Sequence, residues 1–250
     1  MLEVKNLCAG YGHTPVLKNI NLSLKAGTVT VLLGPNGCGK STLLKAISGL
    51  LPTNAGTVTL NEEPILKLPP RILAQKIAYL SQSRQIPDIT VRRMVLHGRF
   101  PYLQYPRRYR NEDFAAADAA MEQMQIVDLA DCLLQNLSGG QRQKVYIAMA
   151  LAQNTPVILM DEPTTYLDAA HQLQMMQQAK ALREEGKTVV LVLHDLSLAL
   201  QVADQVILLQ EGSVAETGTP QSVFESGNLN RVFGVELERV QTPKGWRYYY

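Results

Sequence analysis

The stretch GPNGCGKST, residues 34–42, joins the apolar run TVTVLL, residues 28–33, to a segment with the periodicity of a helix, residues 40–48. Its spacing, a glycine and four residues followed by glycine, lysine and serine, is that of a phosphate-binding loop between a strand and a helix. The glycines allow backbone N–H groups to surround phosphate oxygens, and the start of the helix adds partial positive charge. The stretch therefore predicts an α/β fold that binds phosphate groups.

Two side chains of this phosphate loop (residues 34–42) have specific expected roles. Lys40 should reach the β- and γ-phosphates of a nucleotide, and the Ser41 hydroxyl should coordinate Mg²⁺. The alternative, a glycine-rich turn that binds nothing, is disfavoured by the flanking strand and helix. The loop residues predicted to contact the nucleotide are Gly34, Pro35, Asn36, Gly37, Cys38, Gly39, Lys40, Ser41 and Thr42.

The stretch VILMDE, residues 157–162, predicts the metal side of the same site. Its four apolar residues indicate a buried strand, and two carboxylates follow at the carboxyl end, where ligands bind in α/β sheets. Asp161 is expected to hold Mg²⁺, directly or through water. Glu162 is expected to act as general base for the water that attacks the γ-phosphate. Without the phosphate loop, two solvated acids at a strand end would explain this pair equally well.

Gln82 and His194 each end another apolar run, in YLSQ and LVLHD. A histidine there can contact the γ-phosphate and the attacking water, and an amide can coordinate Mg²⁺ or its water. Alone, His194 would more simply be a structural histidine and Gln82 a polar loop residue, but the phosphate loop and Glu162 favour the functional interpretation. The predicted catalytic residues are Glu162, His194, Gln82 and Lys40, and the predicted metal ligands are Ser41, Gln82 and Asp161.

Composition limits the class of protein. A chain of 250 residues suits one α/β domain, or one core with a smaller subdomain. A net charge of +2 argues against a nucleic-acid partner, and three cysteines fit a reducing cytosol rather than a disulfide framework. The N-terminus has no signal-peptide core, and charged residues interrupt the longest apolar stretch. We therefore expect a soluble chain, in which any membrane role comes through a partner.

Periodicity outlines the other elements. Residues 83–155 change to a helical pattern, with Thr90 and Asn111 as expected N-caps, and are predicted to form a helical subdomain inserted into the α/β core. A βαβ unit with a helix at 169–185 is expected to form a parallel pair of strands. Further strands are expected at 16–24, 56–62 and 76–82, and hairpins at 205–218, turning at Glu211 and Gly212, and at 235–250.

The segment LSGGQ, residues 137–141, places two glycines at the start of a predicted helix. Glycine weakens a helix, so the pair indicates that another group approaches closely. The phosphate loop, Gln82, LSGGQ, VILMDEPTTYLD and His194 follow the order of an ATP-binding cassette (ABC) ATPase, which the chain resembles from Leu2 to about Phe233. The resemblance implies a single ABC ATPase domain over residues 1–250, with a RecA-like parallel core, an antiparallel β subdomain and the inserted helical subdomain.

The resemblance also implies a role for the glycine pair. In the family, LSGGQ meets the γ-phosphate of ATP held by a second chain, because a helix start favours an anion. Two chains would pack head to tail around two ATP molecules, and Asp168 would belong to the loop that communicates across this interface. Tyr11 matches the aromatic residue that stacks on adenine. The residues expected to contact the partner's nucleotide are Leu137, Ser138, Gly139, Gly140 and Gln141.

Two stretches resemble ABC importers of iron–siderophore complexes, haem and cobalamin: HGRFPYLQYPRRYRNEDF, residues 97–114, and DEPTTYLDAAHQ, residues 161–172, with Tyr166, His171 and Gln172. Iron–siderophore uptake is the commonest member and leads, with haem or cobalamin uptake as alternatives. The resemblance implies membrane permease subunits as partners, an extracytoplasmic substrate-binding protein as an indirect partner, and a peripheral position on the cytoplasmic face of the inner membrane.

Three other classes of ABC protein compete with the importer. Soluble cassette proteins that act on ribosomes or DNA usually carry two cassettes or a long coiled-coil insertion, and this sequence has neither. An exporter cassette, or a regulatory module without turnover, is disfavoured by the importer-like stretches and by the presence of Glu162 and His194.

Two further expectations concern charged groups. Cys38 lies in the phosphate loop, where the helix start and Lys40 would lower the pKa of its thiol and make it reactive toward maleimide; the alternative is that Cys38 only fills a turn. A group of arginines would form a solvated basic face or lie near anionic lipid headgroups beneath a membrane partner. These are Arg92, Arg93, Arg99, Arg107, Arg108 and Arg110.

Overall fold

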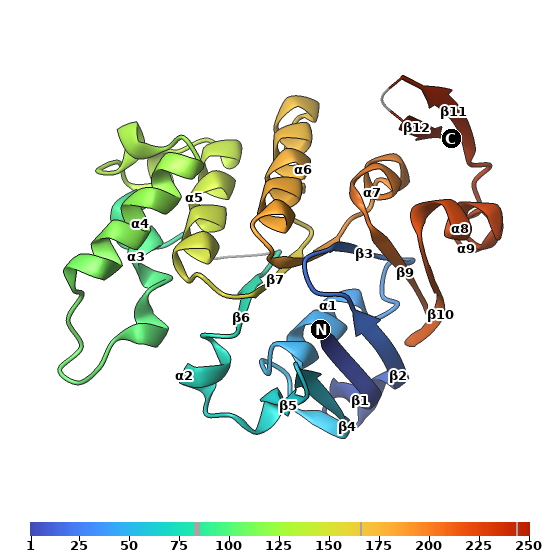
Figure 1. Cartoon of the computed structure of the whole chain (residues 1–250), viewed down its shortest axis with the longest axis horizontal. Coiled ribbons are helices and arrows are strands. Elements are labelled where there is room, and N and C mark those ends of the chain that lie inside the picture. The colour runs from blue at the N-terminus through green and yellow to red at the C-terminus, as the bar shows by residue number, and fades with distance from the viewer. Residues whose placement is uncertain (83–85, 166, 244) are drawn as a thin grey trace.

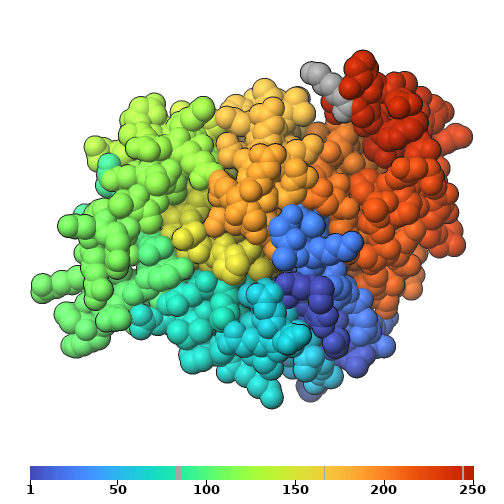
Figure 2. Space-filling view, viewed as in Figure 1, coloured from blue at the N-terminus to red at the C-terminus, as the bar shows by residue number. Residues whose placement is uncertain are grey.

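The computed structural model describes residues 1–82, 86–165, 167–243 and 245–250. Figure 1 shows three regions: a central sheet with helices on both faces, a second sheet along one side, and a group of helices on the other side. In the space-filling view of Figure 2 these regions meet along one continuous surface. Tyr166, from the second importer-like stretch, lies outside the described residues.

Six strands of the described residues form the central sheet: β3 (Val29–Leu33), β6 (Ile77–Leu80), β7 (Val157–Asp161), β8 (Thr188–Val192), β9 (Gln205–Gln210) and β10 (Ser213–Gly218). Their order is β10-β9-β3-β8-β7-β6, and neighbours are parallel except for the antiparallel pair β9 and β10. Every residue of β3, β7 and β8 is buried, as expected for strands covered on both faces. The predicted parallel core is confirmed.

Helices cover both faces of this sheet. On one face, α1 (Lys40–Ile47) buries its apolar side chains with Leu32 of β3. On the other face, α6 (Ala169–Glu184) and α7 (Leu196–Val202) join a cluster that includes Val31. Alternation of side chains along β3 thus divides the hydrophobic core into two layers. The helices expected at 40–48 and 169–185 are confirmed.

The second sheet is antiparallel and shares its core with α1. Its strands are β1 (Leu2–Tyr11), β2 (Thr14–Leu24), β4 (Thr53–Leu60) and β5 (Glu63–Pro64), in the order β2-β1-β4-β5. Register shifts interrupt the pairing of β1 with both of its neighbours. The strands predicted at 16–24 and 56–62 belong to this sheet. The short helices η1 (Ile65–Lys67) and α2 (Pro70–Leu73) follow β5.

The helical group follows β6 in the chain. Thr90 caps α3, since its hydroxyl accepts a hydrogen bond from the Arg93 N–H at 3.4 Å, as predicted. The predicted cap at Asn111 is wrong: Asn111 is the first helical residue of α4, and Asp113 caps the turn by accepting from the Arg110 N–H at 2.9 Å. Its helices are α3 (Val91–His97), η2 (Phe100–Tyr102), α4 (Asn111–Gln123), η3 (Val127–Leu129), η4 (Leu134–Asn136) and α5 (Gly139–Ala152).

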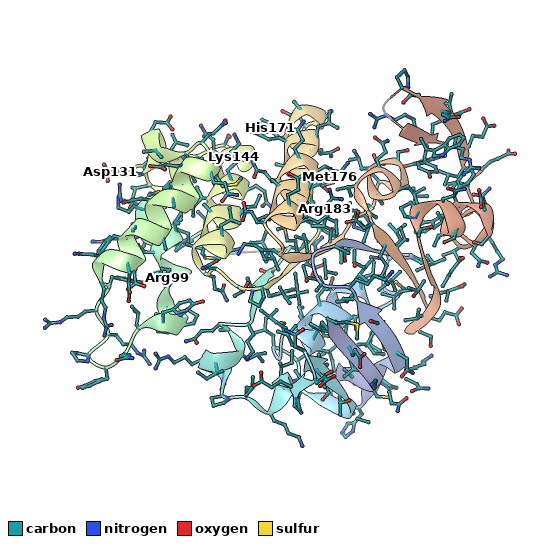
Figure 3. The ribbon with its side chains drawn as sticks, in the orientation of Figure 1. Arg99, Asp131, Lys144, His171, Met176 and Arg183 are labelled. Atoms are coloured by element: carbon teal, nitrogen blue, oxygen red, sulfur yellow. The ribbon has the colours of Figure 1, made fainter. Side chains whose placement is uncertain are left out.

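An ion pair between Arg99, which is labelled in Figure 3, and Asp113 ties this helical group together. Arg99 Nε donates to Asp113 Oδ1 at 3.0 Å, and Nη1 donates to the Ala152 carbonyl at 2.9 Å. The guanidinium also stacks on Tyr102, 3.9 Å from the ring centroid. The two side chains are only 11% and 3% exposed. Arg99 is therefore a buried structural residue, and its assignment to a solvated basic face is wrong.

The C-terminal part packs beside α7. It contains α8 (Pro220–Glu225), α9 (Asn228–Phe233) and the hairpin of β11 (Glu238–Thr242) and β12 (Gly245–Tyr249). Both predicted hairpins are confirmed, and Glu211 and Gly212 form the turn between β9 and β10 with φ of 50° and 79°. Across the described residues, we find no helix with the length and apolar character that a bilayer span requires.

Replacing Asp113 by alanine should destabilise the protein by about 3–5 kcal/mol, because Arg99 would become a buried charge without its partner. Asp118→Ala is the matched control on the same helix: Asp118 pairs with Arg92 but is 46% exposed, so its loss should change the free energy of unfolding by less than about 1 kcal/mol. Urea unfolding followed by circular dichroism measures both variants. Equal destabilisation by the two substitutions would contradict the structural role of the buried pair.

Candidate functional site

The phosphate loop connects β3 to α1 and packs against the hairpin of β9 and β10. Gly34 has a φ of 150°, and a Cβ at this position would lie 2.3 Å from the Leu209 carbonyl oxygen. The Gly212 N–H donates to the Cys38 carbonyl at 3.1 Å, and the Lys18 N–H donates to the Gly212 carbonyl at 2.8 Å. The turn after β9 therefore joins the phosphate loop to the antiparallel sheet.

Lys40 is the first residue of α1, and its side chain folds back along the phosphate loop. The ammonium donates to the carbonyl oxygens of Gly34 at 2.7 Å and Pro35 at 2.9 Å. Lys40 and Thr42 are both about 6% exposed. The loop thus places a buried cation beside the start of a helix, where an anionic phosphate is favoured.

The Asp161 carboxylate at the end of β7 accepts hydrogen bonds on both oxygens. Ser41 Oγ donates to Oδ1 at 2.9 Å, and the Tyr79 hydroxyl donates to Oδ2 at 3.1 Å. Asp161 is 3% exposed, and this burial raises its pKa, while the two hydrogen bonds act in the opposite direction. The phosphate loop and the ends of β6 and β7 are therefore joined through one carboxylate.

Glu162 follows Asp161 with a φ of 51°, a left-handed backbone that is uncommon for a residue other than glycine. Its carboxylate is held by three side chains. His194 Nε2 lies 2.6 Å from Oε1, Thr165 Oγ1 donates to Oε2 at 3.2 Å, and Gln82 Nε2 also donates to Oε2. The structure thus brings Gln82, Glu162 and His194 together at the edge of the sheet where Asp161 lies.

The groups at this edge fit Mg²⁺ and a nucleotide phosphate. A hydroxyl and a carboxylate, those of Ser41 and Asp161, are oxygen ligands of the kind that Mg²⁺ prefers, and Mg²⁺ usually takes one or two carboxylates together with substrate phosphates. Across the described residues, no group of three or more His, Cys, Asp or Glu side chains could hold a metal ion. Mg²⁺ at this site would therefore depend on the nucleotide phosphates as further ligands. Lys40 and the start of α1 would supply positive charge for the phosphates.

Tyr11 lies at the end of β1 beside the helix that follows the phosphate loop. Its side chain is 48% exposed, and the Lys45 ammonium of α1 is 6.0 Å from its ring centroid. An exposed ring at this place is accessible for stacking on a base bound next to the phosphate loop.

The LSGGQ segment begins α5 with a complete N-terminal cap. Ser138 Oγ accepts from the Gln141 N–H at 3.2 Å, and Gln141 Oε1 accepts from the Ser138 N–H at 3.0 Å. This reciprocal pair is a capping box. Leu137 is buried in the hydrophobic core. The segment is therefore a fixed helix start rather than a flexible loop.

The two glycines of this segment have different surroundings. A Cβ on Gly140 would lie 3.3 Å from the His171 ring, whereas a Cβ on Gly139 would meet no described atom within 4 Å beyond its chain neighbours and the backbone of its own helix. Gln143 of α5 also donates to the Pro163 carbonyl at 2.9 Å. Figure 3 shows Lys144 and His171 on the neighbouring helices α5 and α6. The helix start therefore contacts α6 of its own chain, and Gly139 faces outward.

His171 also bonds to Asp168, the residue before α6. Asp168 Oδ1 accepts from the His171 N–H at 2.9 Å and lies 2.8 Å from ring Nδ1. These bonds lower the pKa of the Asp168 carboxyl. Gln172 closes the same loop by donating to the Leu167 carbonyl at 3.1 Å.

Comparison with known proteins identifies the family. The chain matches the ABC transporter family over residues 17–165. It is 40% identical over 245 residues to the iron(3+)-hydroxamate import ATP-binding protein FhuC of Bacillus subtilis (strain 168), covering 97% of this chain and 91% of the relative. The chain belongs to the ABC transporter family. The resemblance derived from the motifs is thereby confirmed.

Two further relatives of this ABC transporter chain bear on the site. The hemin import ATP-binding protein HmuV of Rhodococcus jostii (strain RHA1) is 39% identical over 243 residues, covering 97% of this chain and 82% of the relative. Among solved structures, the dimeric structure of an ATP-binding cassette in a post-hydrolysis state bound to ADP and Pi gives a TM-score of 0.77. It is 33% identical, covering 88% of this chain and 99% of the other. The predicted ABC ATPase fold is confirmed.

Two residues at the ABC site were missed from the sequence, Tyr79 and Thr165. Tyr79 lies opposite Leu159 in the parallel pairing of β6 and β7. Asp161 follows Leu159 by two residues, so Tyr79 and Asp161 lie on the same face of the sheet. A single hydroxyl in the apolar run IAYL, just before Gln82, was the available signal. Thr165 follows Glu162 by three residues, and this spacing alone does not predict a contact between their side chains.

The expected low pKa of Cys38 is wrong. The thiol is 6% exposed, and this burial raises its pKa, although Lys40 acts in the opposite direction from 3.9 Å. Burial disfavours the charged thiolate more than the lysine favours it.

Cys38 should therefore react slowly with maleimide at neutral pH, and its rate should rise as the pH increases past the range in which an ordinary thiol titrates. A raised pKa leaves less thiolate at each pH, and burial limits access. The exposed Cys132 is the internal reference and should be labelled first. Peptide mass spectrometry after timed labelling measures both residues. Faster labelling of Cys38 than of Cys132 at neutral pH would restore the low-pKa interpretation.

Proposed function

We propose that this chain is the ATP-hydrolysing, energy-coupling subunit of a membrane importer for iron–siderophore complexes. The observation that carries the ATPase part is the convergence of Lys40, Ser41, Asp161 and Glu162 at one edge of the sheet, with Ser41 bonded to Asp161 at 2.9 Å. Similarity over 97% of the chain to a protein named for iron(3+)-hydroxamate import supports the substrate class. A similar identity to a hemin import protein supports haem as the alternative, with cobalamin as a further one.

Each side chain of the site has a role in the proposed reaction. Lys40 and the N–H groups of the phosphate loop hold the β- and γ-phosphates. Ser41 and Asp161 would hold Mg²⁺, with Gln82, which bonds to the neighbouring Glu162, as a further ligand, and the metal would neutralise charge on those phosphates. Glu162 accepts a proton from the attacking water, and His194 contacts this water and the γ-phosphate. Tyr11 stacks on the adenine.

A second copy of the chain completes each site in this proposal. The backbone of Gly139 does not have a positive φ, so its conformation does not require glycine. Its own chain also leaves space for a side chain at this position. Glycine in a helix is less favourable than alanine by roughly 1 kcal/mol, so the fold of the single chain gives no reason for it. Close approach by a γ-phosphate bound to a partner chain gives that reason. A related cassette that forms a dimer supports this arrangement.

In this proposal the importer also contains permease subunits, and an extracytoplasmic binding protein is an indirect partner. This chain would lie on the cytoplasmic face of the inner membrane. Phe100 and Tyr105, 50% and 97% exposed, line a groove with Arg71 of α2. Exposed aromatic groups in a groove are typical of protein contacts, which supports this groove as the permease contact.

We also propose that residues 83–155 are one helical subdomain within a single ABC domain spanning residues 1–250.

A soluble ABC protein that acts on ribosomes or DNA is the competing class. Co-purification with a membrane permease separates the two classes. Stimulation of ATPase activity in the reconstituted complex by an iron–siderophore complex, and not by haem or cobalamin, separates the substrates.

Glu162→Gln should bind ATP but hydrolyse it roughly 10²–10⁴-fold more slowly, because the amide cannot accept the proton from water. The variant should accumulate as an ATP-bound dimer in size-exclusion chromatography. Lys40→Ala is the contrasting variant and should weaken nucleotide binding itself. ATPase activity of Glu162→Gln close to that of the wild type would remove Glu162 from the general-base role.

Mixing a Lys40→Ala chain with a Gly139→Asp chain should restore part of the ATPase activity that each homodimer lacks. The added carboxylate would face the γ-phosphate, and at about 4 Å two unit charges repel by roughly 4 kcal/mol at an effective dielectric near 20. In the mixed dimer one site carries both defects and the other carries neither. If LSGGQ served the ATP of its own chain, each site would carry one defect. A mixture with demonstrated heterodimers and no activity would then count against shared sites, unless strict coupling between the sites is shown separately.

A further inference from the structure

Tyr79 makes a hydrogen bond to which the proposed reaction assigns no role. We propose that Tyr79 is a positioning residue for the metal carboxylate: its hydroxyl holds Asp161 so that the other carboxylate oxygen faces Mg²⁺. This inference rests on the proposed function, because it concerns the binding of Mg²⁺ together with ATP. It assigns Tyr79 to metal affinity rather than to nucleotide affinity or to the chemical step.

The two oxygens of Asp161 are distinguished by their partners. Oδ1 accepts from Ser41 Oγ at 2.9 Å, and Ser41 is the other expected metal ligand, so Oδ1 lies on the metal side of the carboxylate. Oδ2 accepts from the Tyr79 hydroxyl at 3.1 Å and is directed toward β6. A bond on Oδ2 opposes rotation of the carboxylate plane. Tyr79 therefore fixes which oxygen, and at what angle, is presented to the metal.

The strands that carry the two residues make this bond rigid. β6 and β7 pair in parallel register from Ile77 with Val157 to Leu80 with Met160. Tyr79 lies opposite Leu159, and Asp161 follows Leu159 by two residues, so both side chains lie on the face covered by α1. Neither residue is on a loop. Ligands supported from packed strands are held more accurately than ligands supported from loops.

Burial increases the importance of the hydroxyl. Asp161 is 3% exposed, so water has little access to its oxygens and each protein donor matters. The other residues of β6 are Ile77, Ala78 and Leu80, which makes the Tyr79 hydroxyl the one side-chain polar group of this described strand. Packing alone would need only the ring. The hydroxyl directed at Asp161 is the feature that a packing role leaves unexplained.

Tyr79→Phe removes the hydroxyl and keeps the ring. Binding of the non-hydrolysable analogue AMP-PNP is measured calorimetrically, once with Mg²⁺ and once with EDTA in its place. The variant should bind AMP-PNP about tenfold more weakly with Mg²⁺ and unchanged with EDTA, since loss of a hydrogen bond to a metal ligand typically lowers metal affinity by about 10–100-fold. Mn²⁺ electron paramagnetic resonance with AMP-PNP should give the same loss in metal affinity directly.

Tyr102→Phe is the matched control. The Tyr102 hydroxyl donates to the Gln153 carbonyl at 2.8 Å within the helical group, away from Asp161. This variant should behave as the wild type with and without Mg²⁺. Tyr79→Phe with unchanged Mg²⁺ dependence, or with the same loss in EDTA, would overturn the inference. A wild-type chain whose binding of AMP-PNP is insensitive to Mg²⁺ would overturn the proposed function, and the inference with it.

Discussion

The parallel register of the central strands is the constraint on which the rest of the site depends. Because β3, β6, β7 and β8 run in one direction, the segments that leave their carboxyl ends meet at a single edge. Residues far apart in the sequence are thereby joined through two neighbouring carboxylates. Ser41 and Tyr79 bond to Asp161, and Gln82 and His194 contact Glu162. The helices and the antiparallel sheet stabilise this edge by covering the two faces of the strands.

Much of this arrangement could be predicted from the sequence, since buried parallel strands are short apolar runs and the phosphate loop has a fixed spacing. What could not be predicted depends on neighbours in space. Arg99 belongs to a group of arginines in the sequence, and only the approach of Asp113 and Ala152 distinguishes it as a buried residue. The thiol of Cys38 stands two residues from a lysine, but its burial decides the direction of the pKa shift. Asn111 is a residue type that often caps helices, yet the cap comes from Asp113, which accepts from the backbone N–H of Arg110.

The contacts of α5 link the two functional parts of one chain. Gln143 bonds to the carbonyl of Pro163, the residue after Glu162, and Gly140 packs against His171 at the start of α6. The segment that would serve the partner's ATP is thus attached to the loop that begins at the chain's own Glu162. Movement of either segment would therefore alter contacts of the other. In the proposed dimer, these contacts would connect the two ATP sites through the interior of each subunit.

The anchoring of the phosphate loop has a consequence for how binding energy is distributed. Ordering the backbone of one residue costs about 1–2 kcal/mol of conformational entropy. A loop that became ordered only on binding would lose much of the energy of its phosphate contacts in this way. Here the Gly212 N–H of the neighbouring hairpin bonds to the Cys38 carbonyl of the loop, so the loop backbone is held before any ligand binds. In the proposed dimer, the energy gained from the phosphates would then remain available to draw two subunits together.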